Sequence, residues 1–339
     1  MNTLSFPGLG IGEFRINRTA FSVFGFDIRW YGIIITTGIV LAFLYVLYRS
    51  KFEKIKVDDV LDLGLFSVLP GIVGARLYYV FSTWDKHVVT GGYFFENVRD
   101  TFVNIVSTRN GGLAVYGGII AVVIAAALVA KYKKIKFAKF LDMLGPAAMI
   151  GQMVGRWGNF FNVEAFGTAT DLPWRMGILT TSGTTRFVHP TFLYESLWNL
   201  LGFLIINALY KKKKYDGQIF VMYVTWYGLG RMFIEGLRTD SLMLGVFRIS
   251  QIVAFVSFAA GTIVLIVLGI KARNERIAAS AYTNLFIKKD GDEVSSINEE
   301  TKPDITVDIF EAVAQESEKA DDIGEDAETE EVAEDGKDN

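Results

Sequence analysis

The sequence predicts an all-α integral membrane protein, a polytopic bundle of about seven transmembrane helices with its N-terminus outside and its C-terminus in the cytoplasm. Three observations support this prediction. The 339 residues are 51% hydrophobic, with a mean hydropathy of +0.32. Several apolar runs are long enough to cross a bilayer, which takes roughly 20 residues of helix. Positive charge is concentrated in alternate connections between these runs.

Three runs without any charged residue predict the first, third and seventh spans. They cover Trp30–Tyr48, Asn110–Ala130 and Ile249–Ile270. Four further apolar runs carry one or a few ionisable groups, at about 60–83, 140–161, 190–210 and 217–236. A soluble all-α protein could bury one or two such helices, but seven between short loops would leave too little polar surface to cover them.

Lysine and arginine orient the spans. The connections between spans 1 and 2, 3 and 4, and 5 and 6 hold 13 basic residues, whereas the opposite loops are longer and sparser in charge. Basic loops favour the cytoplasmic side, which places the N-terminus outside and the C-terminus inside. The expected organisation is an extracytoplasmic segment over residues 1–28, a membrane catalytic domain over 29–273 and an acidic tail over 274–339.

Charge is divided unevenly along the chain. Residues 290–339 hold 20 Asp and Glu against 3 Lys, whereas residues 1–289 hold 31 Lys and Arg against 17 Asp and Glu. A segment this polar cannot bury enough apolar surface to fold alone. The tail is therefore expected to be a disordered cytoplasmic extension, and the overall net charge says little about partners.

The composition also excludes several kinds of chemistry. The chain has no cysteine and two histidines, His87 and His189. Disulfide frameworks, cysteine-based metal sites and a cysteine nucleophile are therefore excluded, and so is a histidine-rich metal site. No metal ion, organic cofactor or nucleic-acid partner is expected.

Ionisable and polar residues gather at one depth of the predicted bundle. A charged side chain in a spanning helix costs about 2.5–3.5 kcal/mol on insertion scales, so each such residue needs a reason. The predicted orientation brings polar residues of six spans to the outer-leaflet side: Tyr31, Arg76, Tyr116, Arg156, His189, Glu195, Arg231 and Glu235. Asp62 and Asp142 fall on the inner side, as helix-start or loop-contact residues.

The segment 155–167 carries the densest group of these residues. Arg156 and Asn159 are three apart and share a helical face, and Glu164 and Gly167 follow. The simple reading is an interfacial anchor whose arginine reaches the headgroups. An arginine with two asparagines, a glutamate and three glycines in 13 residues favours a functional site.

Two other segments leave alternatives open. Arg231, Glu235 and Arg238 have the i,i+4 and i,i+3 spacing of an in-helix ion-pair chain, which accounts for Glu235 but not for the arginines, since an apolar pair would cost less. His189 precedes Pro190, so a helix-start role and a chemical role are equally open. Several arginines at one depth predict a site for an anionic ligand, because a guanidinium group can donate two parallel hydrogen bonds to a phosphate.

Together these motifs resemble the prolipoprotein diacylglyceryl transferase family, bacterial membrane enzymes that begin lipoprotein maturation. The resemblance covers about residues 21–271. Its signature is Gly155-Arg156-x-Gly158-Asn159-Phe160-x-Asn162-x-Glu164-x-x-Gly167, and the other motifs follow the family's order: Trp30-Tyr31-Gly32, Gly74-Ala75-Arg76, Gly111-Gly112-Leu113, His189-Pro190-Thr191-x-Leu193-Tyr194-Glu195 and Arg231-x-x-x-Glu235-x-x-Arg238.

The resemblance implies a reaction and its partners. The diacylglyceryl group of phosphatidylglycerol is transferred to the lipobox cysteine thiol of a preprolipoprotein signal peptide, a thioether forms and glycerol phosphate leaves. Arg156 and Arg231 are then the essential arginines. The lipid site is expected to include Tyr31, Asn159, Glu164, Gly167, Glu235 and Arg76. The enzyme would act in the bacterial cell membrane, among membrane lipids, with its site toward the outer leaflet.

One position departs from the family pattern. Many members carry histidine where this chain has Tyr116, and tyrosine, with a pKa near 10, does not normally accept a proton at neutral pH. Thiol activation is therefore left to the positive field of the arginines, or to Tyr116 or His189.

Two functions of other classes compete with this one. A transporter or flippase for an anionic solute or lipid would distribute its charges through the membrane and break its helices at mid-depth, which the clustering on one side disfavours. A receptor or scaffold would explain the acidic tail but not the arginines.

Overall fold

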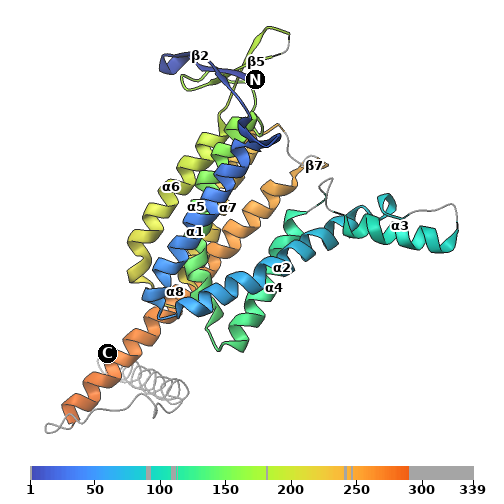
Figure 1. Ribbon diagram of the computed structural model, residues 1–339. Coiled ribbons are helices and arrows are strands. Elements are labelled where there is room, and N and C mark those ends of the chain that lie inside the picture. Colours follow the sequence, from blue (N-terminus) through green and yellow to red (C-terminus); the bar gives the residue numbers. More distant parts are fainter. Residues whose placement is uncertain are drawn as a thin grey trace, which may run out of the picture. The chain divides into compact units, whose positions relative to one another are not determined.

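The computed structural model describes residues 2–88, 93–107, 112, 114–180, 182–239, 243–245 and 247–289 (Figure 1). The chain divides into two compact units, 1–269 and 270–339. Only the end of the last helix represents the second unit in the described part of the chain, and residues 290–339 of the predicted tail lie outside it.

Each of the seven predicted spans coincides with one long helix. These are α1 (Trp30–Glu53), α2 (Val57–Ser82), α4 (Val115–Tyr132), α5 (Phe137–Asn162), α6 (Thr191–Leu209), α7 (Gln218–Leu237) and α8 (Ile249–Lys289). Four of them, α1, α2, α6 and α8, are long and apolar enough to cross a membrane, and α4 is apolar but shorter. The fold is thus mostly helical and consistent with an all-α membrane protein.

Short strands add a sheet that the sequence prediction missed. Four antiparallel strands pair in the order β2-β1-β5-β6, from β1 (Asn2–Phe6), β2 (Ile11–Ile16), β5 (Met176–Leu179) and β6 (Thr185–Val188). The sheet stands at the end of the bundle where α1 and α6 begin (Figure 1). Leu4, Met176 and Val188 are buried beneath it against Phe192 of α6. The sheet therefore fixes the loop between α5 and α6 over the bundle.

Two further hairpins and one short α-helix also occur among the described elements, besides single 3₁₀ turns at Pro7–Leu9, Trp84–Lys86 and Tyr210–Lys212. The hairpins and the α-helix are β3 (Thr19–Val23) with β4 (Phe26–Arg29), β7 (Met243–Leu244) with β8 (Phe247–Arg248), and α3 (Phe94–Val106). Among them, α3 is too short to span a bilayer and lies beside the ends of α2 and α4 (Figure 1).

The opposite end of the bundle is held together by buried ion pairs. Lys213 Nζ lies 2.7 Å from Glu53 Oε1 of α1 and 3.0 Å from Asp142 Oδ2 of α5. Asp142 also accepts the backbone N–H groups of Gly217 and Phe220, at 2.9 and 3.1 Å. The prediction that Asp142 contacts a loop is confirmed, and the basic connection between α6 and α7 is thereby tied to two other helices.

Replacing Lys213 by methionine is expected to destabilise the protein by about 3–5 kcal/mol, because it leaves two buried carboxylates without their counter-charge. The measurement is the thermal unfolding midpoint of the purified protein, followed by intrinsic tryptophan fluorescence. Lys212→Met is the matched control, since Lys212 is exposed one position earlier. Equal midpoints for the two variants would contradict a structural role for Lys213.

Candidate functional site

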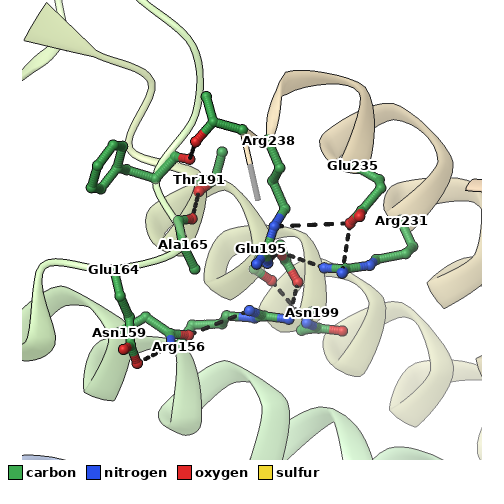
Figure 2. Close-up of polar contacts among 12 residues, drawn as sticks. Arg156, Asn159, Glu164, Ala165, Thr191, Glu195, Asn199, Arg231, Glu235 and Arg238 are labelled. Carbon is green, nitrogen blue, oxygen red and sulfur yellow. Dashed lines mark hydrogen bonds and ion pairs between the residues drawn. The ribbon is translucent and has the colours of Figure 1, made fainter. Parts of the chain in front are cut away.

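A buried carboxylate at the sheet-bearing end of the bundle joins three helices. Glu195 of α6 is 3% exposed. Its Oε2 lies 2.5 Å from Arg156 Nη2 of α5, and its Oε1 lies 3.0 Å from Arg231 Nη1 of α7 (Figure 2). Arg238 Nη1, just past the end of α7, lies 3.6 Å from the same Oε1. The two arginines expected to be essential therefore share one partner.

A second buried carboxylate extends the cluster along α7. Glu235, 2% exposed, has its Oε2 2.6 Å from Arg231 Nη2 and 3.9 Å from Arg238 Nε (Figure 2). The ion pair predicted between Arg231 and Glu235 within the helix is thus confirmed, whereas Arg238 reaches Glu235 from just past the end of α7. Three guanidinium groups therefore converge on two buried carboxylates. Guanidinium groups gathered in this way are suited to binding an anion.

Amide side chains continue the cluster toward the end of α5. Arg156 Nη1 donates to Asn159 Oδ1 at 3.3 Å, and Asn159 Nδ2 donates to Glu164 Oε1 at 3.0 Å (Figure 2). Asn162 Nδ2 donates to the same oxygen at 3.1 Å. Glu164 lies beyond the end of the helix, after Val163 at a φ of 52°. The spacing of the motif is therefore that of a hydrogen-bond chain orienting one face of the Arg156 guanidinium.

Gly167 lies where three segments converge. Its N–H donates to the His189 carbonyl at 2.9 Å, and the next N–H, of Thr168, donates to the Leu237 carbonyl at 2.7 Å. A Cβ at Gly167 would lie 2.7 Å from His189 Cβ and 3.1 Å from the Leu237 carbonyl oxygen. Only glycine fits here, so the residue fixes the distance between the ends of α5 and α7 and the start of α6.

The start of α1 packs on the same end of α5. A Cβ at Gly158 would lie 2.8 Å from Tyr31 Cδ2, so the tyrosine ring covers the glycine beside Asn159. Trp30 stacks on Phe161 with ring centroids 5.2 Å apart. Tyr31 is thereby brought to the edge of the cluster, so that α1 joins α5, α6 and α7 around it.

His189 precedes α6 and contacts a tyrosine. Its Nδ1 lies 3.2 Å from the Tyr194 hydroxyl oxygen, which also accepts a hydrogen bond from Trp174 Nε1 at 2.7 Å. The Tyr194 hydroxyl therefore links the indole of Trp174 to the His189 ring, and the direction of the bond to Nδ1 depends on the tautomer of the imidazole. Partial burial lowers the pKa of His189 and favours the neutral form.

Arg76 and Tyr116 lie in a different part of the bundle, where α2 packs against α4. Arg76 donates to three backbone carbonyls, those of Asn104, Ile105 and Gly112, at 2.6, 2.8 and 2.8 Å. Tyr116 is 57% exposed on the first turn of α4. Arg76 is thus engaged in holding the end of α3 and Gly112, and not in the cluster around Glu195 to which it was predicted to belong.

A pair of tryptophans locks α6 to α7 near the cluster. Trp198 and Trp226 stack with centroids 4.4 Å apart, and each indole Nε1 donates to the other residue's carbonyl at 3.0 Å. A Cβ at Gly230 would lie 2.1 Å from Trp198 Nε1, so glycine there makes room for the ring. This lock fixes the rotation of both helices, and with it the relative position of Glu195 and Arg231.

Two members of the cluster were not among the predicted site residues. Glu195 is the only charged residue in an otherwise apolar run, and Arg238 follows Glu235 at i+3; both signals were visible in the sequence.

Across the described part of the chain, no group of three or more histidine, cysteine or carboxylate side chains is placed to hold a metal ion.

Known proteins match most of the chain. A family model described as prolipoprotein diacylglyceryl transferase matches residues 18–267. The phosphatidylglycerol–prolipoprotein diacylglyceryl transferase of Finegoldia magna is 46% identical over 252 residues, which is 74% of this chain and 95% of that protein. The enzyme of the same name from Clostridioides difficile is 41% identical over 259 residues, 76% of this chain and 98% of that protein. That from Acaryochloris marina is 41% identical over 241 residues, 69% and 84% of the respective chains.

Proposed function

Since the chain belongs to the prolipoprotein diacylglyceryl transferase family, we propose that it transfers the diacylglyceryl group of phosphatidylglycerol to the lipobox cysteine of preprolipoproteins. The protein is a multi-pass membrane transferase of this family. The transfer forms a thioether, releases glycerol phosphate and is the first step of lipoprotein maturation.

The proposal includes a topology. All seven long helices cross the bacterial cell membrane, the N-terminus is outside and the C-terminus is in the cytoplasm. Support comes from the basic connections after α1, α4 and α6, which lie at the end of the bundle opposite to the arginine cluster. Because basic loops stay in the cytoplasm, the cluster would face the outer leaflet, where a secreted substrate emerges. Residues 1–28 would then be extracytoplasmic and 274–339 cytoplasmic.

The observation that carries the mechanism is the convergence of Arg156 and Arg231, from two helices, on the buried Glu195. The phosphodiester of phosphatidylglycerol carries one negative charge, which these guanidinium groups would bind. The cysteine sulfur attacks the glyceryl carbon, the bond from that carbon to the phosphate oxygen breaks, and the electron pair leaves with glycerol phosphate. Arg156 and Arg231 stabilise the charge that grows on the leaving oxygen, in a site that excludes most water.

The remaining predicted residues would orient this pair. Asn159 and Glu164 hold one edge of the Arg156 guanidinium, and Glu235 holds one edge of Arg231. Gly167 and Tyr31 close the site from neighbouring segments. Arg76 would contribute only if a bound lipid extended toward α2 and α4.

The positive charge of the arginines is proposed to activate the substrate, because it lowers the pKa of a nearby thiol and favours the thiolate. His189 Nδ1 faces the Tyr194 hydroxyl. The proton of the thiol is released to water, and glycerol phosphate leaves as a phosphate monoester with a second pKa of about 6, so atoms and charge balance.

The deciding experiment supplies the purified protein with labelled phosphatidylglycerol and a lipobox peptide. Transfer of label to the peptide cysteine is expected, and a peptide with serine in place of that cysteine should stay unlabelled. A flippase would move labelled lipid between leaflets without a peptide product, and a scaffold would give neither result. Absence of a lipidated peptide from folded protein would overturn the proposal.

Tyr116→Phe is expected to slow transfer without abolishing it, because the ring is half exposed on α4 and a phenol is a weak base at neutral pH. Initial rates in the peptide assay give the measurement. Tyr132→Phe, at the other end of the same helix and also exposed, is the control. Complete loss of transfer in folded Tyr116→Phe would make the hydroxyl essential.

A further inference from the structure

The β3–β4 hairpin is a two-stranded sheet of its own, immediately before α1. Its register pairs Phe21 with Ile28, Ser22 with Asp27 and Val23 with Phe26. The Trp30 N–H donates to the Arg18 carbonyl at 3.0 Å and closes the base of the hairpin on the first turn of α1. An isolated two-stranded hairpin is marginally stable in water, so this one needs a surface to pack against.

The two faces of the hairpin differ completely in chemistry. Side chains alternate between faces along a strand, and directly paired residues share a face. Phe21, Val23, Phe26 and Ile28 therefore form one apolar face, and all four are exposed, Phe26 by 75%. Ser22 and Asp27 occupy the other face, where the serine hydroxyl donates to the carboxylate at 2.5 Å.

The turn places a third phenylalanine at the tip. Phe24 has a φ of 48° and Gly25 a φ of 82°, the signs required at both central positions of a type I′ turn. Asparagine or aspartate is favoured at the first of these positions, and a bulky side chain with positive φ is uncommon. Phe24 is also 96% exposed. In water this choice is unfavourable both for the backbone and for the ring.

We propose that the tip and apolar face of the β3–β4 hairpin insert into the lipid leaflet in which α1 begins, and so anchor the sheet-bearing end of the bundle to the membrane surface. The hairpin is followed without an intervening residue by α1, which begins at Trp30 and is long and apolar enough to cross a membrane. The hairpin therefore lies where α1 leaves the hydrocarbon, at the depth where aromatic side chains are favoured.

Charge on the hairpin fits this orientation. Asp27 and Ser22 face away from the apolar surface, so they can stay at the headgroup level while the four apolar side chains enter the leaflet. The exposed apolar side chains of α1, such as Ile39 and Leu44, continue the lipid-facing surface. Lipid is therefore favoured as the occupant over a second copy of the chain or a bound peptide.

The absence of cysteine from the chain makes the test direct. Single-cysteine variants Phe24→Cys, Phe26→Cys and Ser22→Cys of the full chain are labelled with a nitroxide and reconstituted in phosphatidylcholine–phosphatidylglycerol vesicles. Collisions with dissolved oxygen report lipid, and collisions with a water-soluble nickel chelate report water. The labels at 24 and 26 are expected to favour oxygen several-fold more than the matched label at 22 on the opposite face.

Two outcomes would overturn the proposal. Equal nickel accessibility at all three positions would place the apolar face in water. Protection of 24 and 26 from both reagents would show that protein covers the face. Because the readout needs no transfer activity, its result is separate from that of the peptide assay.

Phe24→Asn, combined with the label at 26, guards against a perturbed turn. Asn-Gly is a preferred type I′ turn, so the hairpin is kept while the apolar tip is lost. The label at 26 is then expected to shift toward the nickel reagent. No shift would mean that Phe24 does not hold the hairpin in the leaflet.

Discussion

Arg156→Lys is expected to lower the rate of diacylglyceryl transfer by about 10²–10³-fold, which corresponds to about 3–4 kcal/mol of transition-state stabilisation. Arg156 uses one Nη atom for Glu195 and the other for Asn159. These two contacts fix the plane of the guanidinium, and we expect a phosphate oxygen to bind to the N–H groups that they leave over. Lysine keeps the charge but has no planar fork, so it cannot hold these partners in one geometry.

The measurement is the initial rate of label transfer to the lipobox peptide in reconstituted vesicles, with the folded fraction determined separately. Arg186→Lys is the control, because Arg186 is an exposed residue of β6 and its replacement should leave the rate unchanged. A near-normal rate for Arg156→Lys would contradict recognition by a fixed guanidinium plane and leave a role for positive charge alone.

Glu195→Gln is expected to have the largest effect on both stability and activity. The substitution keeps the size of the side chain but removes the charge shared by Arg156, Arg231 and Arg238. Removing one partner from a buried ionic cluster typically costs about 3–5 kcal/mol. The arginines also lose the contact that sets their spacing, so transfer should fall by orders of magnitude even in the folded fraction.

Thermal unfolding and the peptide assay measure the two effects on the same preparation. Glu13→Gln in the exposed strand β2 controls for the loss of a carboxylate as such. If folded Glu195→Gln transfers lipid at the rate of the unmodified protein, the carboxylate does not organise the arginines for catalysis.

The helices were predictable from hydropathy, with errors at their ends. The run Trp30–Tyr48 corresponds to α1, which continues to Glu53, and the run 140–161 corresponds to α5. Hydropathy marks only the apolar part of a helix, whereas the backbone hydrogen bonds of the helix can continue through the polar residues that follow. The sheet escaped prediction because β1 pairs with β5 across about 170 residues of sequence, and its strands are too short to show a clear period.

Contacts within one segment were predictable, but contacts between helices were not. Arg231 and Glu235 lie on α7 and Arg238 follows its last residue, so their spacing alone predicts their contacts. The contact of Glu195 with Arg156 and Arg231 depends on how three helices are rotated about their axes, which no single run encodes. Arg76 illustrates the difference, since it was predicted to join the cluster while its helix packs against α4 and its guanidinium binds backbone carbonyls.

The reciprocal hydrogen bonds between Trp198 and Trp226 limit where a lipid substrate can enter the bundle. A phospholipid with two acyl chains can leave the bilayer only where neighbouring helices part. At the level of the stacked indoles, opening the boundary between α6 and α7 would break two hydrogen bonds and a ring stack at once. We therefore expect lipid to enter on another flank of the bundle, while the boundary between α6 and α7 stays closed at this level.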